Sequence, residues 1–140
     1  MDDTLFLLKP SALQGIGVFA AQAISCSTLV FPDWSRMVKR NINDIPPDFI
    51  HFCIFVNDEQ ALCPPRYDYL TMDNYLNHSF EPNVKINSHK KMETVRNINK
   101  GEEILINYNQ FNEPEHLKST YYCLHKMDGH KRVIYPTQTQ

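Results

Sequence analysis

The chain has 140 residues, a formal net charge of -2, and 42% hydrophobic and 21% charged residues. This length suits one domain with its own hydrophobic core, and the composition excludes a disordered chain. The small net charge gives no reason to expect direct binding to nucleic acid.

Four cysteines, at positions 26, 53, 63 and 123, form no Cys-x-x-Cys pair. So few thiols without a disulfide pattern favour a reduced, intracellular protein. The start, Met1-Asp2-Asp3, is acidic where a secretion signal is basic, and no apolar run reaches the length of a membrane span. We therefore expect a soluble protein inside the cell, without contact to a membrane.

The first third of the chain predicts two strands around a pair of glycines. Residues 4–8 predict a buried first strand that stops at Pro10, and residues 24–31 predict a second strand region rich in β-branched side chains. Between them lie Gly15 and Gly17, two of only four glycines in the chain. Paired glycines allow a positive φ or a close approach of the backbone to another group.

Residues 32–70 have a looser pattern. Within them, residues 48–55 predict a short helix, and a strand over residues 52–56 is the alternative. We expect this insert to determine specificity rather than to carry chemistry.

A dense polar segment follows at residues 75–83, Tyr-Leu-Asn-His-Ser-Phe-Glu-Pro-Asn. Asn and Ser hydrogen-bond to nearby backbone and favour loops, and Pro82 makes Glu81 extended. Because buried polar groups need partners, either the chain or a ligand must supply them. By itself the segment is typical of an Asx-rich turn.

The last part of the chain predicts more short strands. Residues 84–86 and 91–98 alternate apolar and polar side chains, and residues 104–108 predict a final strong strand. A helical patch is expected at residues 113–122. Many short strands and few short helices predict a mainly β fold.

The spacing Gly15-x-Gly17-x-x-Ala20 also matches the dinucleotide-binding fingerprint. That fingerprint needs a strand directly before it and a helix after it, within alternating β and α elements. Pro10 separates the first predicted strand from the glycines, and no such alternation follows. A dinucleotide-dependent redox protein is therefore the least favoured of the three functions considered.

Three motifs stand in a fixed order along the chain: Gly15-Ile16-Gly17-Val18-Phe19, then Asn77-His78-Ser79 with Pro82-Asn83, then Gly101-Glu102-Glu103-Ile104 through Tyr108. In this order they resemble the SET domain family of protein lysine methyltransferases. The resemblance implies small sheets with a C-terminal pseudoknot, in which residues 77–83 pass beneath a loop made by the last strand. Residues 1–108 would form the domain, with residues 32–70 as a variable insert, and residues 109–140 would form its lid.

The resemblance also implies roles by position. Tyr108 would be the catalytic residue. S-adenosyl-L-methionine would be held by Gly15, Ile16, Gly17, Val18, Phe19, Asn74, Asn77, His78 and Tyr108, and the substrate lysine by a channel that includes Tyr75, Ile106, Phe111 and Tyr121. The chain departs from the family pattern at two positions, since Asn74 replaces an Arg and Phe80 replaces a Cys.

Methyl transfer to an amine suits these residue types. It is an in-line displacement that needs alignment and desolvation more than strong acid–base catalysis. The lysine must attack as a neutral amine, and its deprotonation near neutral pH costs about 4 kcal/mol from a reference pKa of ~10.4. An aromatic channel lowers that pKa by desolvation, and a tyrosine hydroxyl orients the amine without carrying charge.

The tail contains Cys123, His125 and His130, whose spacing is similar to a zinc-binding tail of many relatives. Structural zinc takes four ligands, and Phe80 stands where the fourth is expected and cannot ligate. We therefore predict no metal site.

The leading hypothesis is an S-adenosylmethionine-dependent protein lysine methyltransferase. The alternative is a catalytically inactive SET-like binding module, because of the departures at Asn74 and Phe80. The expected partner is a lysine-containing protein, with a histone tail as one candidate and a nuclear or host-nuclear location in that case. A homodimer is left open.

Overall fold

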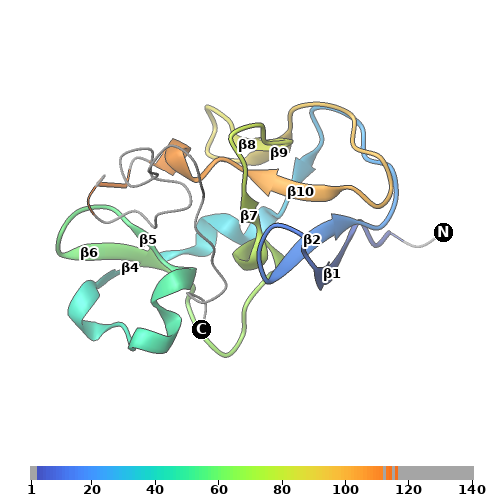
Figure 1. Ribbon diagram of the computed structural model, residues 1–140. Helices are drawn as coiled ribbons and strands as arrows, with labels where there is room; N and C mark the ends of the chain where they lie inside the picture. The colour runs from blue at the N-terminus through green and yellow to red at the C-terminus, as the bar shows by residue number, and fades with distance from the viewer. Residues whose placement is uncertain (1–2, 112, 115, 117–140) are drawn as a thin grey trace. The chain divides into compact units, whose positions relative to one another are not determined.

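The computed structural model describes residues 3–111, 113, 114 and 116, and its strands form three small sheets joined by short 3₁₀ helices (Figure 1). The mainly β class predicted from the sequence is confirmed. The chain divides into two compact units. The first unit comprises Met1–Ser35 and Thr71–Asn107, and the second comprises Arg36–Leu70 and Tyr108–Gln140. Among the described residues, no helix is long and apolar enough to cross a bilayer.

The first unit contains two sheets. The larger has the strand order β1-β2-β10-β7, with β1 at Phe6–Pro10, β2 at Ile16–Ala20, β10 at Glu103–Ile106 and β7 at Asn77–His78. The smaller has the order β3-β9-β8, with β3 at Leu29–Val30, β9 at Met92–Thr94 and β8 at Val84–Ile86. Helix η4 spans Met72–Tyr75, and η1 spans Pro32–Arg36, across the sequence boundary between the units.

The β1–β2 hairpin corrects the prediction for residues 4–8. The strand begins two residues later, includes Pro10, and is half-buried to exposed rather than buried. Pro10 is tolerated because β1 is an edge strand and Pro10 pairs with Ile16 at a position that needs no N–H. Along an antiparallel ladder, pairs with hydrogen bonds alternate with pairs without them. Ser11 and Gly15, the pair next to Pro10 and Ile16, are hydrogen-bonded, with Ser11 N–H donating to Gly15 O at 2.7 Å.

Three other strand predictions were too long. Of residues 91–98 only Met92–Thr94 form a strand. Of residues 24–31 only Leu29–Val30 form a strand, because Ser27 has a φ of 63° and turns the chain. The strand predicted over residues 104–108 is β10, which ends at Ile106. Its partner β7 ends at the paired residue His78, so no neighbouring strand is present to continue the ladder.

The second unit has one sheet with the order β4-β6-β5, with β4 at Val38–Asn41, β6 at Gln60–Cys63 and β5 at Ile54–Phe55. Its 3₁₀ helices are η2 at Ile42–Asp44, η3 at Pro47–Phe52 and η5 at Tyr108–Phe111. The helix predicted over residues 48–55 is therefore wrong at its end, where the chain enters β5. Ile45, Cys53, Ala61 and Cys63 form the core of the unit.

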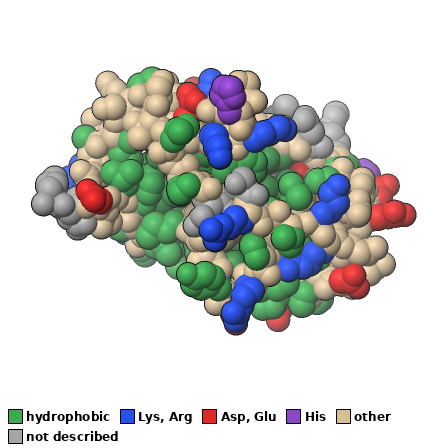
Figure 2. All heavy atoms as spheres, turned by 180° about the vertical axis from the view of Figure 1, so that it is seen from behind, with side chains coloured by type: hydrophobic (Ala, Val, Ile, Leu, Met, Phe, Trp, Pro, Cys, Tyr) green, Lys and Arg blue, Asp and Glu red, His purple; other side chains and the backbone are tan. Residues whose placement is uncertain are grey.

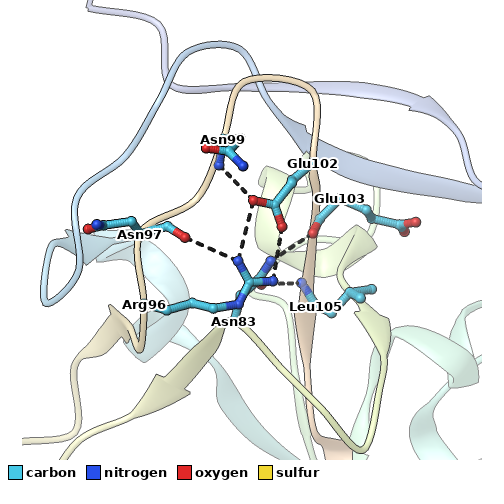
Figure 3. Close-up of polar contacts among 7 residues, drawn as sticks. All are labelled: Asn83, Arg96, Asn97, Asn99, Glu102, Glu103 and Leu105. Atoms are coloured by element: carbon cyan, nitrogen blue, oxygen red, sulfur yellow. Dashed lines mark hydrogen bonds and ion pairs between the residues drawn. The ribbon is translucent and has the colours of Figure 1, made fainter.

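The segment 77–83 lies along β10 in the first unit. Asn77 and His78 pair in parallel with Leu105 and Ile106. Asn83, only 1% exposed, donates from Nδ2 to Glu103 O at 2.8 Å and accepts at Oδ1 from Leu105 N–H at 2.7 Å (Figure 3). The backbone of β10 thus supplies the partners that this polar segment requires.

An ion pair lies beside Asn83 on the turn that leads into β10. Arg96 Nη2 is 2.9 Å from Glu102 Oε2, and Asn99 N–H donates to the same carboxylate at 2.7 Å (Figure 3). The Arg96 hydrogen bond, followed by that from Asn99, lowers the pKa of Glu102. Both partners are solvent-accessible, so the pair contributes at most about 1 kcal/mol. The buried Asn83 bonds have the larger part in fixing β10.

We expect Asn83→Ala to lower the free energy of unfolding by about 2–3 kcal/mol, because it leaves a buried carbonyl and a buried N–H without partners. Asn99→Ala is the matched control, since the Asn99 side chain is exposed and a change there costs less than about 0.5 kcal/mol. Urea unfolding followed by fluorescence measures both variants. Equal midpoints for the two would show that Asn83 does not hold β10.

Candidate active site

The Glu103 carboxylate is the centre of a polar network in the first unit. It accepts from Ser11 Oγ at 2.9 and 3.0 Å and from Asn77 Nδ2 at 2.8 Å. Asn77 Nδ2 also donates to Gln14 O at 3.0 Å. These bonds attach the loop between β1 and β2 to both β7 and β10.

Gly17 leaves the space that this network occupies. A Cβ added there would lie 2.9 Å from Glu103 Cδ, which is too close for carbon, and 3.1 Å from Asn77 Nδ2, which is a tight contact. A Cβ added at Gly15 would meet no atom within 4 Å, but the φ of 48° at this residue favours glycine. The two glycines therefore serve different needs, since Gly17 makes room for a carboxylate and Gly15 allows the loop to turn.

The backbone of β2 is mostly engaged in the sheet. Val18 pairs with Leu8 on one side and with Ile104 on the other, and its side chain is fully buried. Phe19 pairs likewise with β1 and β10. Ile16 pairs with Pro10 at a position without ladder hydrogen bonds, so its N–H and C=O groups point away from β1. The pairing of β2 with β10 does not reach Ile16, so β10 does not bind these groups either. Of the predicted cofactor stretch 15–19, its first residues are thus best placed for a ligand.

The loop before β2 has an inverted burial pattern. Leu13 and Ile16 are 53% and 50% exposed. Figure 2 shows that hydrophobic side chains also lie at the surface on the face that it presents. Between them, the side-chain oxygen Oε1 of Gln14 is buried and has no hydrogen-bond partner among the described residues. Apolar groups in solvent beside a buried, unpaired acceptor indicate a binding site rather than a core. From the sequence, no site role was expected for Ser11 or Gln14, and Glu103 stood there only as a member of the third motif.

Asn77 and His78, which the resemblance assigns to the cofactor, are both buried on β7. The His78 ring meets the ring of Phe80 edge-on, with centroids 4.5 Å apart and an interplanar angle of 89°. Phe80, which stands at the family's Cys position, therefore packs against the motif histidine.

Asn74 and Tyr75 lie on η4, also in the first unit. Asn74 Oδ1 accepts from Thr71 N–H at 2.9 Å and so caps the first turn of this helix. That bond is a structural reason for an Asn here. Tyr75 is half-buried at the end of the helix.

The remaining predicted residues are divided between the units. Ile106, 2% exposed, ends β10 in the first unit. Tyr108 and Phe111 are the first and last residues of η5 in the second unit, and both are half-buried. Tyr108 follows β10 by only two residues. Tyr121 lies outside the described residues.

Metal-binding side chains do not cluster in the described part of the chain, where no group of three or more His, Cys, Asp or Glu is arranged to hold a metal ion. Cys123, His125 and His130 lie outside it.

We expect Gly17→Ala to lower the free energy of unfolding by about 1–3 kcal/mol, because the new methyl group overlaps the Glu103 carboxylate. In a double-mutant cycle with Glu103→Ala, the two changes should cost less together than the sum of the single changes, since removal of the carboxylate makes room. Thermal unfolding of all four proteins measures this. Strict additivity would contradict the network.

The comparisons with known proteins agree with this architecture. The sequence profile of the SET domain matches residues 15–109. The fold is similar to the crystal structure of a Plasmodium falciparum protein described provisionally as a histone methyltransferase, with a TM-score of 0.53 and 24% identity over 76% of this chain and 95% of that one. No match is found among curated proteins. With more than half of its length matched, and with the motifs on β2, β7 and β10, the chain belongs to the SET domain family.

Proposed function

We propose that this protein is an S-adenosylmethionine-dependent protein lysine methyltransferase. The observation that carries the proposal is the parallel pairing of β7 with β10. It sets Asn77 and His78 beside Leu105 and Ile106, at the end of the strand that leads into Tyr108. Two of the three family motifs are thereby joined by backbone hydrogen bonds, and the third lies on the neighbouring strand β2.

The loop around Gln14 fits a ligand with a cationic donor. Gln14 Oε1 is a buried acceptor without a partner in the described structure, and leaving it so costs about 1–3 kcal/mol. The Glu103 carboxylate lies near the backbone of Gln14, since Asn77 Nδ2 donates to both Glu103 and Gln14 O. A neutral and a negative acceptor favour an ammonium group, which the aminoacyl end of S-adenosylmethionine carries. We assign Gln14, with the backbone of Gly15 and Ile16, to hold that end.

When bound, the cofactor supplies the electrophilic methyl group. The task of this chain is then to hold a neutral lysine amine in line and to exclude water. We assign the Tyr108 hydroxyl to orient the amine, and Tyr75, Ile106 and Phe111 to line its channel. In the first unit Tyr75 is half-buried and Ile106 is buried, and in the second unit Tyr108 and Phe111 are both half-buried.

A protein lysine is the proposed substrate, and a histone tail is the first candidate, since the Plasmodium falciparum protein with a similar fold is described in those terms. A nuclear location would follow from a histone substrate. An intracellular location is proposed in either case.

We expect Tyr108→Phe to reduce methyl transfer by about 100-fold, because it removes one hydroxyl from the transition state while it keeps the ring. Binding of S-adenosylmethionine, measured by calorimetry, should change little. The assay follows labelled methyl transfer to core histones and to a cell lysate. Tyr69→Phe is the control, since that side chain is 76% exposed. Cofactor binding without Tyr108-dependent transfer would favour the inactive binding module.

We expect Gln14→Leu to weaken the binding of S-adenosylmethionine about tenfold while the protein keeps or gains thermal stability. A ligand contact is lost, and a buried acceptor without a partner is removed at the same time. Gln22→Leu is the matched control, because the Gln22 amide donates to Thr4 O at 2.6 Å within the protein. That variant should lose stability and keep its affinity. A loss of stability in Gln14→Leu at unchanged affinity would assign Gln14 a structural role instead.

A further inference from the structure

Cys53, which directly precedes β5, lies opposite Cys63, the last residue of β6 in the second unit. Strands β5 and β6 pair antiparallel, with Ile54 opposite Leu62 and Phe55 opposite Ala61. One step further along the same register, Cys53 stands opposite Cys63.

The hydrogen bonds of this hairpin define the type of pair that the cysteines form. Val56 N–H donates to Gln60 O at 3.0 Å, so the pairs that carry ladder bonds include Val56 with Gln60 and, two residues on, Ile54 with Leu62. Cys53 and Cys63 then form a pair without ladder bonds. In agreement, Cys53 N–H points away from β6 and donates to Ile50 O at 3.1 Å.

Such a pair has the geometry of a disulfide. Residues opposite each other in an antiparallel ladder, at a position without ladder bonds, have Cα atoms about 4.5 Å apart, and disulfides span about 4.4–6.8 Å. Side chains on one face of a sheet alternate with those on the other, so Cys53, Phe55, Ala61 and Cys63 share a face, and all four belong to the same core cluster. The two thiols therefore face each other inside the core.

The surroundings make these thiols slow to react. Cys53 is 8% exposed and Cys63 is fully buried. Burial, followed by the neighbouring Cys63 thiol, raises the pKa of Cys53. Burial, followed by the hydrogen bond with Cys63, also raises the pKa of Tyr67 to about 12. A thiol with a raised pKa is a poor nucleophile, so a reagent reaches this pair only when β5 and β6 open locally. Cys26 is exposed and has no such protection.

We infer that Cys53 and Cys63 are an oxidisable dithiol, a modification site that closes to a disulfide within the second unit by exchange with a small-molecule disulfide such as oxidised glutathione. One thiolate attacks the glutathione disulfide and releases one glutathione, and the second thiolate then attacks the mixed disulfide and releases the other. The two S–H bonds of the protein and the S–S bond of oxidised glutathione break. One S–S bond forms in the protein, and the two protons and two electrons form the S–H bonds of two reduced glutathione molecules.

The experiment uses the full chain and a Cys26→Ser/Cys123→Ser variant, in which only the pair remains. Each protein is incubated natively with oxidised glutathione, and each is also refolded from denaturant in a glutathione redox buffer, which removes the barrier of burial. After alkylation of free thiols, peptide mapping by mass spectrometry identifies the linked residues.

We expect a linked Cys53–Cys63 peptide that has lost two hydrogens, about 2 Da, and that separates on reduction. Native closure should be slower than the glutathionylation of Cys26, and the refolded, oxidised variant should melt about 5 °C or more above its reduced form. Free or singly glutathionylated Cys53 and Cys63 after refolding, or a link to Cys123 in the full chain, would overturn the inference.

Discussion

The Glu103 carboxylate holds together three segments that are far apart in the sequence. It accepts hydrogen bonds from Ser11 at the end of β1 and from Asn77 on β7, and it lies over the Cα of Gly17 on β2. Since Asn77 also bonds to Gln14 O, one acid and one amide position the loop in which the candidate cofactor contacts lie. The rest of the site depends on this constraint, because a shift of that loop would move Gln14, Gly15 and Ile16 together.

Asn83 has the corresponding role at the other end of the motif. Its side chain bonds to the backbone of β10 at two points. Asn83 is buried, whereas the Arg96–Glu102 ion pair is accessible to water. In both places an uncharged amide does the fixing, through bonds whose loss would leave buried groups without partners. The polar density of residues 75–83 thus has a largely structural cause, and only part of it remains for a ligand.

The second unit has a different kind of core. It is small, and cysteines and half-buried aromatics fill it, with Tyr67 stacked on Phe49 at 4.7 Å and the Arg40 guanidinium over the Tyr67 ring at 5.1 Å. Arg40 also donates to Pro64 O at 2.6 Å and to Pro65 O at 2.8 Å, which fixes the turn after β6. This sheet was expected only as an irregular insert, because its short strands are interrupted by 3₁₀ turns and show no sustained alternation.

By itself the sequence determined the mainly β class and the order of the three motifs, since glycine pairs, Asx-rich turns and β-branched runs are local signals. It also indicated the strand that leads toward Tyr108, although it extended that strand past Ile106, where pairing ends. Only the tertiary structure decided what Gly17 is for, which acceptor is left without a partner at Gln14, and which cysteines face each other. The first two depend on contacts between distant segments, and the third on the register of the β5–β6 hairpin. Register is set by pairing and packing rather than by any local run of residues.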